Sequence, residues 1–354
     1  MKNNYLITTG GSGGHVVPAT IFYEHLYNKA NLIMTTDKRG LKYLNNNEYK
    51  FNIINTPKLS NILLLPFNFI IILFLIIKSF FLMKKEKIQK IISTGGYMSL
   101  PLIFAAKIMN LDIYLIEPNQ IIGRANRFFL KSCTKIFCYT DKIKNFPKEY
   151  MNKVVVVNPL VKKKFYDLNL KNKYNDKFNI LIVGGSQGAK IFDEKLKTSL
   201  VNISKKFPIR IFQQSNESNI QKLADYYSKY GIENKIFSFE KNSISIFQNA
   251  NLCITRAGAS TLAELSILNI PFLAVPLPSS KDNHQFENAN YYKNNGCCWI
   301  LEQKFFNEKI EEFLENIINN KSDYIKKKEN LKKLNYLNNW INVNQKILKN
   351  LNEY

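Results

Sequence analysis

Short apolar runs alternate with segments of helical periodicity along most of the chain, in two consecutive series. Buried strands that alternate with helices are typical of a parallel sheet with right-handed crossover connections. We therefore expect an α/β protein with two domains, each built on its own parallel sheet. The runs are Tyr5–Thr9, Lys90–Ser93, Ile113–Ile116, Ile136–Tyr139 and Val154–Val157 in the first series, and Ile180–Val183, Ile209–Phe212, Ile236–Phe239, Leu252–Thr255 and Phe272–Val275 in the second.

A break in this pattern separates the two series. Asn158-Pro159 is followed by the lysines at 162–164 and by the polar stretch Leu170–Lys177. Proline and charge interrupt both periodicities, so we expect the hinge here. The predicted domains are residues 1–158 and 159–337. The C-terminal end of the chain has a charged, helical pattern, and a helix over about residues 338–354 is expected to pack back onto the first domain.

The segment Ile62–Met83 is apolar over a length that approaches a membrane span. Three interpretations stay open: a helix buried between the sheet and a second layer, a helix lying in the membrane interface, and a transmembrane helix. Pro66, Asn68 and Lys78 interrupt the run, which disfavours a span. Basic residues beside an apolar face meet anionic lipid headgroups, so the lysines that surround its end favour the interfacial helix: Lys78, Lys84, Lys85 and Lys87.

The charge balance adds little to this picture. The chain has 50 Lys and Arg against 27 Asp and Glu, a formal charge of +23, which predicts attraction to polyanions. The abundance of Lys, Asn and Ile also fits an AT-rich genome, so charge alone selects no partner. The five cysteines have no paired spacing and the three histidines are too few for an obvious zinc site. No apolar signal segment follows Met1, and we expect a cytoplasmic protein with reduced thiols.

Two glycine-rich turns stand at the ends of predicted strands. Gly10–His15 and Gly184–Gly188 each follow an apolar run and lead into a helical segment. Backbone N–H groups and the positive helix end point the same way at such a turn, which favours an anion. A third turn with Gly95 and Gly96 follows the strand at 90–93, where a tight connection is the alternative explanation. His15 either takes a proton as a general base or caps its helix.

Two polar segments follow strands in the second half of the chain. Small residues from Ala257 to Thr261 would let a ligand approach a helix start, and Glu264 lies about one turn further on. Its carboxylate suits the two hydroxyls of a ribose. The loop at 276–285 ends in Asp282, His284 and Gln285, whose donors and acceptors suit sugar hydroxyls, although each residue alone is typical of an exposed loop.

Taken together, these segments resemble the MurG family of peptidoglycan glycosyltransferases. The resemblance covers nearly the whole chain and includes GGSGGH at 10–15, TGGY at 94–97, Glu117-Pro118-Asn119, Asn158-Pro159, GGSQGA at 184–189, RAGASTLAE at 256–264 and the loop at 282–285. It implies the GT-B arrangement, with two Rossmann-like domains facing a cleft. It also implies an inverting transfer of N-acetylglucosamine from UDP-N-acetylglucosamine to undecaprenyl-pyrophosphoryl-N-acetylmuramoyl-pentapeptide, giving lipid II.

The resemblance assigns roles residue by residue. It implies a donor or acceptor diphosphate beside the first turn, and we expect the acceptor diphosphate there. For the proposed transfer, His15 is the leading candidate for the general base and Glu117 the weaker alternative. On the donor side the resemblance places Ser186 at the phosphates, Glu264 on the ribose and Gln285 on the sugar. The remaining implied contacts are Ser12, Gly13, Gly14, Gly95 and Gly96 for diphosphate, Asn119 for a sugar, Ala259, Ser260, Thr261, Leu262 and Ala263 for the nucleotide, Glu240 near the uracil, and His284 beside Gln285.

The chain departs from the family pattern at two places. Where the family usually reads Gly-Asn-Pro-Val-Arg, the chain has Val157-Asn158-Pro159-Leu160-Val161-Lys162, so Lys162 stands near the position of a donor-contacting arginine. Lysine lacks the bidentate fork of arginine. The usual His-Glu-Gln-Asn is replaced by Ile116-Glu117-Pro118-Asn119, which affects how Asn119 is placed.

No Asp-X-Asp pair occurs in the sequence, so we expect donor binding without a metal and without a cofactor. The resemblance implies a peripheral protein on the cytoplasmic face of the bacterial inner membrane, with anionic lipids as partners and no nucleic acid. Contact with other proteins of cell-wall synthesis stays open. Two other functions also stay open: a soluble UDP-N-acetylglucosamine 2-epimerase and a non-catalytic, membrane-bound nucleotide-sugar sensor.

Overall fold

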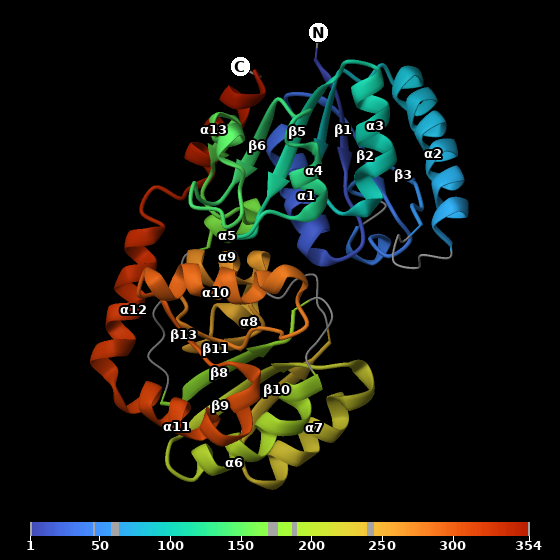
Figure 1. Ribbon diagram of the computed structural model, residues 1–354. Helices are drawn as coiled ribbons and strands as arrows, with labels where there is room; N and C mark the ends of the chain where they lie inside the picture. Colours follow the sequence, from blue (N-terminus) through green and yellow to red (C-terminus); the bar gives the residue numbers. More distant parts are fainter. Residues whose placement is uncertain are drawn as a thin grey trace. The chain divides into compact units, whose positions relative to one another are not determined.

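The computed structural model describes residues 2–44, 47–57, 64–168, 176–185, 190–238 and 244–352. The chain divides into two compact units (Figure 1). The N-terminal unit is Met1–Lys163 together with Asn339–Tyr354, and the C-terminal unit is Lys164–Asn338. The division therefore falls a few residues beyond Asn158, within the run of lysines.

The N-terminal unit is built on a seven-stranded parallel sheet in the order β3-β2-β1-β4-β5-β6-β7. The five strands predicted for this region are confirmed, whereas two strands at one side of the sheet escaped prediction, β2 and β3. The strands are β1 Asn4–Thr8, β2 Asn31–Thr36, β3 Phe51–Ile53, β4 Lys90–Ser93, β5 Asp112–Glu117, β6 Lys135–Cys138 and β7 Val154–Val156.

Helices cover both faces of this sheet. On one face, the buried side chains of Leu6, Ile91 and Leu115 share a core with α2, α3 and α4. On the other face, Phe22 of α1 packs edge to face on Phe137 of β6, at 5.1 Å between ring centroids. The helices are α1 Gly13–Leu26, α2 Leu65–Lys85, α3 Leu100–Ile108, α4 Arg124–Phe129 and α13 Trp340–Leu351, with α5 Lys163–Tyr166 at the division.

The last helix, α13, belongs to the N-terminal unit although residues 164–338 precede it. It lies along α1. The buried Lys90 donates from Nζ to the carbonyl of Leu351 at 2.7 Å, which places a cation at the negative end of a helix. The chain therefore returns to the first sheet after completing the second.

The C-terminal unit contains a six-stranded parallel sheet in the order β10-β9-β8-β11-β12-β13. Its five predicted strands are confirmed, and the edge strand β13 was not predicted. The strands are β8 Phe178–Val183, β9 Ile209–Gln214, β10 Glu233–Phe237, β11 Leu252–Thr255, β12 Phe272–Ala274 and β13 Cys298–Ile300. The helices are α6 Lys197–Ser204, α7 Glu217–Lys229, α8 Ile244–Phe247, α9 Ala259–Ile267, α10 His284–Asn294, α11 Phe306–Asn319 and α12 Lys321–Leu334. One core cluster joins Ile182 and Ile254 of the sheet to Phe306 and Leu314 of α11.

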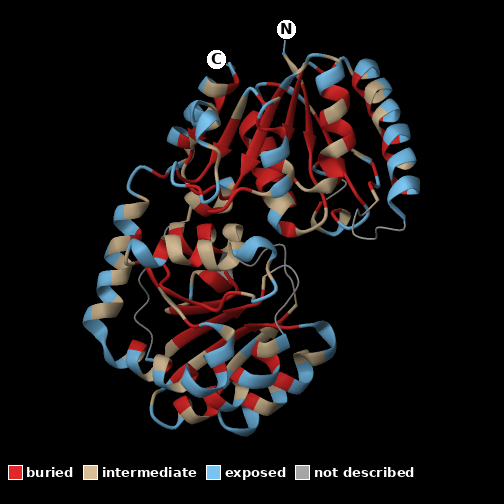
Figure 2. Cartoon of the chain, in the orientation of Figure 1, coloured by how far each residue is buried: buried red, intermediate tan, exposed pale blue. Residues whose placement is uncertain are grey.

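The apolar segment forms the 21-residue helix α2, and the prediction of a helix buried between two layers is wrong. Only 17% of its most apolar 18-residue window is buried, although the helix is long and apolar enough to cross a membrane. One narrow stripe packs against α3, at positions spaced by three and four residues: Asn68, Ile72, Leu75, Ser79 and Met83. The opposite face, exposed in Figure 2, carries Phe67, Phe69, Ile70, Leu73, Phe74, Ile77 and Phe81. A helix with one packed and one exposed apolar face is therefore the observed arrangement.

Candidate functional site

The turn at Gly10–His15 and the turn with Gly95 and Gly96 come together in the N-terminal unit. They follow β1 and β4, which are parallel neighbours, so their carboxyl ends meet at one edge of the sheet. The hydroxyl of Thr94 donates to the hydroxyl of Thr9 at 2.9 Å. Gly11 has a φ of +78° and Gly96 a φ of +80°, values that favour glycine. The two turns thus form one continuous surface.

His15 is held across this surface by the second turn. Its Nδ1 lies 2.7 Å from the carbonyl oxygen of Thr94. A carbonyl only accepts, so Nδ1 carries the proton and Nε2 carries a lone pair in the neutral ring. Nε2 lies 3.5 Å from the position that a side chain on Gly96 would occupy. The contact fixes the ring in the tautomer that a base at Nε2 requires.

The same turn presents the start of α1. Ser12 has extended backbone angles at the N-cap, and within the described residues its side chain makes no capping hydrogen bond. The amides of His15 and Val16 donate to the carbonyl of Ser12 at 3.0 and 3.1 Å. The amides of Gly13 and Gly14 precede them and have no carbonyl partner within the helix. They are positioned to bind an anion, because the helix dipole adds to their polarity.

Glu117 lies at the end of β5 and is 2% exposed. Its Oε1 accepts from the amide and from Nδ2 of Asn119 at 3.2 and 3.0 Å. Its Oε2 accepts from the amide of Gly123 at 2.7 Å and from Nδ2 of Asn126 at 3.0 Å. A carboxylate with four donors around it is already engaged in holding the loop. The geometry therefore gives Glu117 the task of placing Asn119.

A cluster that the sequence did not predict lies beside these turns. Asp37 and Arg39 follow the unpredicted strand β2, which pairs with β1. Asp37 accepts from the amide of Gly11 at 2.7 Å, and Arg39 donates to Asp37 from Nε and Nη2 at 3.0 and 2.7 Å. Burial alone would raise the pKa of Asp37, but the hydrogen bonds from Gly11, Arg39 and Gly40 outweigh it and hold the pKa below its usual value. Asp37 is therefore ionised at neutral pH.

In the C-terminal unit, α9 begins directly after β11 and Gly258. The amide of Leu262 donates to the carbonyl of Gly258 at 3.0 Å, which is the hydrogen bond of the first α-helical turn. Ala259, Ser260 and Thr261 form that turn, where the helix amides favour an anion. The hydroxyl of Ser260 is buried and, among the described residues, has no hydrogen-bond partner. Leu262 and Ala263 are buried behind the turn, and Glu264 is half-buried.

Gln285 links the two segments that carry the predicted donor site. Its Oε1 accepts from the amides of Ala257 and Leu277 at 3.2 and 3.0 Å. Its Nε2, which makes no hydrogen bond in the described part of the chain, is left as a donor. Arg256 braces the same loops, because Nη1 donates to the carbonyl of Val275 at 3.0 Å and Nη2 to Oε1 of Gln303 at 2.6 Å. Burial lowers the pKa of Arg256.

The backbone before Gln285 is strained. Asp282 and Asn283 have φ values of +52° and +55°, in the left-handed region that side chains rarely adopt. Such strain is often found in binding loops. His284 follows and is anchored locally, with Nδ1 2.8 Å from the carbonyl oxygen of Lys281. This hydrogen bond ties the His284 side chain to its own loop.

Three predicted contacts need separate mention. Ser186 and Glu240 lie outside the described residues. Lys162 is half-buried in the segment just before the division between the units. The side chains of Leu160 and Val161 beside it are 1% exposed, so the segment that carries Lys162 is anchored in the N-terminal unit.

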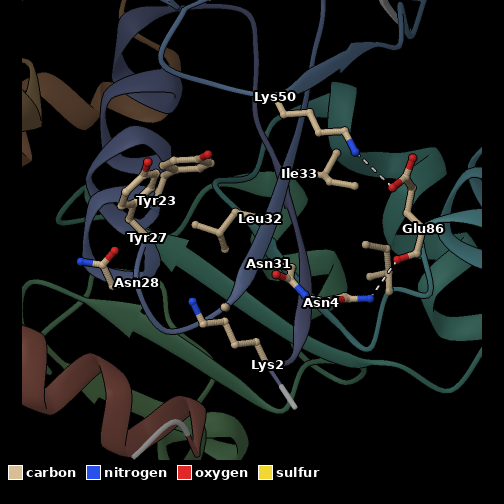
Figure 3. A pocket seen from close by; sticks show the side chains of 12 residues that line it. Lys2, Asn4, Tyr23, Tyr27, Asn28, Asn31, Leu32, Ile33, Lys50 and Glu86 are labelled. Carbon is tan, nitrogen blue, oxygen red and sulfur yellow. Dashed lines mark hydrogen bonds and ion pairs between the residues drawn. The ribbon is translucent and has the colours of Figure 1, made fainter.

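A pocket of about 640 Å³ lies elsewhere, at the amino ends of β1 and β2 (Figure 3). Lys2, Asn4, Tyr23 and Tyr27 line it, and Lys50 pairs with Glu86 at 3.3 Å on one side. The glycine turns stand at the carboxyl ends of the same strands. Ligands of open parallel sheets bind at the carboxyl ends of the strands, so this pocket is not part of the candidate site.

Comparison with known proteins agrees with this arrangement. Residues 5–138 match the glycosyltransferase family 28 N-terminal domain and residues 179–339 match the glycosyltransferase family 28 C-terminal domain. The UDP-N-acetylglucosamine--N-acetylmuramyl-(pentapeptide) pyrophosphoryl-undecaprenol N-acetylglucosamine transferase of Pelagibacter ubique is 48% identical, with 100% of each chain covered. The enzyme of the same name from Rickettsia prowazekii is 33% identical over 89% of this chain and 91% of its own.

A solved structure shares the fold. The MurG of Acinetobacter baumannii superposes with a TM-score of 0.78 at 22% identity, with 100% of both chains covered. The two parallel-sheet units thus correspond to the two domains of the GT-B architecture, as the resemblance implied. With 48% identity over the full length of a curated relative and both family domains present, the chain belongs to the MurG family, within glycosyltransferase family 28.

Proposed function

We propose that the protein transfers N-acetylglucosamine from UDP-N-acetylglucosamine to the 4-hydroxyl of the muramoyl residue of undecaprenyl-pyrophosphoryl-N-acetylmuramoyl-pentapeptide. The full-length identity of 48% to the Pelagibacter ubique transferase carries the proposal. In the transfer, the acceptor oxygen bonds to the anomeric carbon while the bond from that carbon to the UDP oxygen breaks. The hydroxyl proton goes to a base, and UDP takes the bonding electrons.

On the acceptor side, His15 supplies the base. Its Nδ1 contact with Thr94 leaves Nε2 to accept the proton of the attacking hydroxyl. Donating from Nδ1 to a carbonyl also stabilises the imidazolium that results. Glu117 is less suited, because four donors already surround its oxygens. The amides of Gly13 and Gly14, with the turn at Gly95 and Gly96, bind the acceptor diphosphate.

On the donor side, the start of α9 holds UDP together with the glycine-rich segment after β8, of which residues 186–189 lie outside the described residues. The first-turn amides of α9 face the charge that develops as UDP leaves. Glu264 accepts from the ribose hydroxyls, and Gln285 donates to the sugar through Nε2, the nitrogen that its own loop leaves unused. The amides of α9 thus offset the charge of the donor diphosphate, while Glu264 and Gln285 bind its neutral hydroxyl and amide groups.

The lipid of the acceptor requires a membrane, and we propose that α2 rests on it. Its outward face places seven large apolar side chains in solvent, from Phe67 to Phe81. A monomeric protein rarely leaves such a patch uncovered. Lys78, Lys84 and Lys85 on the same helix suit anionic headgroups. Since the other face packs against α3, the helix lies in the interface, at the cytoplasmic face of the inner membrane.

One assay tests the proposal. Purified protein is given UDP-N-acetylglucosamine with and without the lipid-linked muramoyl-pentapeptide, while UDP and the product lipid are followed. UDP release that depends on the acceptor, with matching disaccharide lipid, supports the transferase. Conversion of the donor to its 2-epimer, or UDP release without acceptor, supports the epimerase instead. Donor binding with no turnover supports the sensor.

The residue roles predict two separable defects. His15→Gln keeps a donor for Thr94 but removes the base, so kcat should fall about 100-fold or more while the KM for donor changes little. Glu264→Gln should raise the donor KM about tenfold, because a neutral amide replaces the charged acceptor of the ribose. The exposed Glu308→Gln is the control and should behave as the parent. Normal turnover in His15→Gln would remove His15 from the base role.

A further inference from the structure

We infer that Arg39 is an anion-binding residue of the acceptor site, where its guanidinium contacts the diphosphate that joins the sugar to the lipid. The inference rests on the proposed function and adds to it a charged group. The two glycine turns contribute backbone amides, the hydroxyl of Ser12 and the imidazole of His15 to that surface, and none of these is a guanidinium or ammonium group. Neutral backbone amides form weaker hydrogen bonds to a charged diphosphate than an ionised donor does. The planar guanidinium of arginine is such a donor and suits phosphate oxygens.

Arg39 is fixed in position by the turn that it serves. The side chain of Asp37 is 6% exposed and pairs with Nη2 of Arg39 at 2.7 Å. The other carboxylate oxygen of Asp37 accepts from the amides of Gly11 and Gly40 at 2.7 and 2.9 Å. One buried carboxylate thus ties the glycine turn and the guanidinium together. An anion at this turn would meet a cation that needs no reorganisation.

The second glycine turn also contacts Arg39. The guanidinium carbon lies 5.1 Å from the ring centroid of Tyr97, and Nη2 donates to the Tyr97 hydroxyl. Tyr97 directly follows Gly96, and Nη2 lies 3.5 Å from where a side chain on Gly11 would begin. Arg39 therefore bridges the two turns that carry the proposed diphosphate contacts.

The guanidinium keeps capacity for a ligand. The Arg39 side chain is 44% exposed, and among the described residues Nη1 makes no hydrogen bond. The carboxylate of Asp37 is shared among two amides and the guanidinium, so it does not saturate the cation. Nε and Nη2 are engaged by Asp37 and Tyr97, so the N–H groups of Nη1 are the charged donors left for a phosphate oxygen.

Arg39→Gln tests the inference, because glutamine retains a donor for Asp37 and loses the charge. Lys38→Gln is the matched control, because Lys38 is the exposed neighbour of Arg39 and this substitution removes the same charge. Initial rates are measured against the lipid-linked acceptor and against UDP-N-acetylglucosamine, each at low and high KCl. In Arg39→Gln the KM for the acceptor should rise about tenfold while the KM for the donor stays unchanged. The acceptor KM of this variant should also depend less on the KCl concentration than that of the parent.

A purely structural role predicts other results. If Arg39 only supported the turn, kcat and thermal stability would fall in Arg39→Gln while the salt dependence of the acceptor KM stayed the same, which would overturn the inference. Parent-like acceptor kinetics would overturn it too. If the parent protein transfers no sugar, the proposed function fails by itself. Binding of inorganic pyrophosphate, measured by calorimetry, then decides: weaker binding to Arg39→Gln than to Lys38→Gln supports the anion site, and equal binding overturns it.

Discussion

His25 is a buried titratable side chain that joins the last helix to the first. It is 4% exposed, stacks on Trp340 with 3.7 Å between ring centroids, and contacts Oδ1 of Asn344 through Nδ1 at 3.0 Å. Its Nε2 is buried and, within the described residues, has no partner. Burial lowers the pKa of His25 to about 4, partly offset by the hydrogen bond to Asn344. The folded N-terminal unit therefore holds this histidine neutral.

This neutral histidine predicts acid sensitivity. The unfolded chain binds the proton near pH 6.5 and the folded chain only near pH 4. The contribution of neutral His25 to the free energy of unfolding is fully present above pH 6.5 and is lost as the pH falls towards 4. The total loss is about 3 kcal/mol. Urea unfolding, followed by Trp340 fluorescence in a Trp299→Phe background, measures the free energy at pH 7.5 and pH 5. His25→Phe should lose less stability over this interval than the parent, and an equal loss would contradict the assignment.

At the scale of single residues, the sequence predicts those site residues that are close to one another along the chain. The glycines and His15 were found because a strand, a turn and a helix start are adjacent in sequence. Arg39 was missed because it reaches the turn only through the pairing of β2 with β1. The engagement of Glu117 also depends on donors from Gly123 and Asn126, which a local pattern does not reveal.

The outward face of α2 yields a prediction for a whole element. Phe74 is 65% exposed and Phe81 63% exposed, so replacing both by serine leaves the packed stripe on α3 intact. Full burial of a phenylalanine side chain contributes about 1.5 to 3 kcal/mol to the binding free energy, and a helix in the membrane interface buries part of each side chain. Binding of the double variant to phosphatidylglycerol-containing vesicles, measured by co-sedimentation, should weaken about tenfold or more.

Two controls make this experiment decisive. Ile325→Ser removes an exposed apolar side chain from α12 in the other unit and should leave vesicle binding unchanged. Circular dichroism of each variant should match the parent. If the α2 double variant binds vesicles as the parent does, α2 does not rest on the membrane.

Strands were predictable where burial on both faces leaves an uninterrupted apolar run. β4 and β11 agree with the predicted ranges at both ends, and all four residues of each are buried. The edge strands β3 and β13 were missed because Asn52 interrupts β3 and only Cys298 of β13 is buried. The edge strand β7 is equally short and was found from its run of three valines. β2 begins with exposed and half-buried residues, so only part of it looks apolar. For α2, the composition was evident, but the packed stripe required the position of α3.

At the scale of the whole molecule, the two series of strands became two units with separate sheets and separate cores. The alternation of strands and helices was sufficient for this because each parallel sheet needs its own crossovers. The return of α13 was expected only in outline. Its place depends on Lys90 and His25, side chains far away in sequence that meet the helix in the N-terminal unit.

Each unit contains one of the two tryptophans of the chain, Trp299 in the C-terminal unit and Trp340 in the N-terminal unit. The proposed donor contacts, Glu264 and Gln285, lie in the C-terminal unit. A ligand stabilises the unit that binds it by about 2.7 kcal/mol at one hundred times its Kd. UDP-N-acetylglucosamine should therefore shift the urea midpoint seen by Trp299, in Trp340→Phe protein, and leave the midpoint seen by Trp340, in Trp299→Phe protein, in place. A shift seen by Trp340 alone would contradict the donor assignment, and equal shifts would show that the units unfold together.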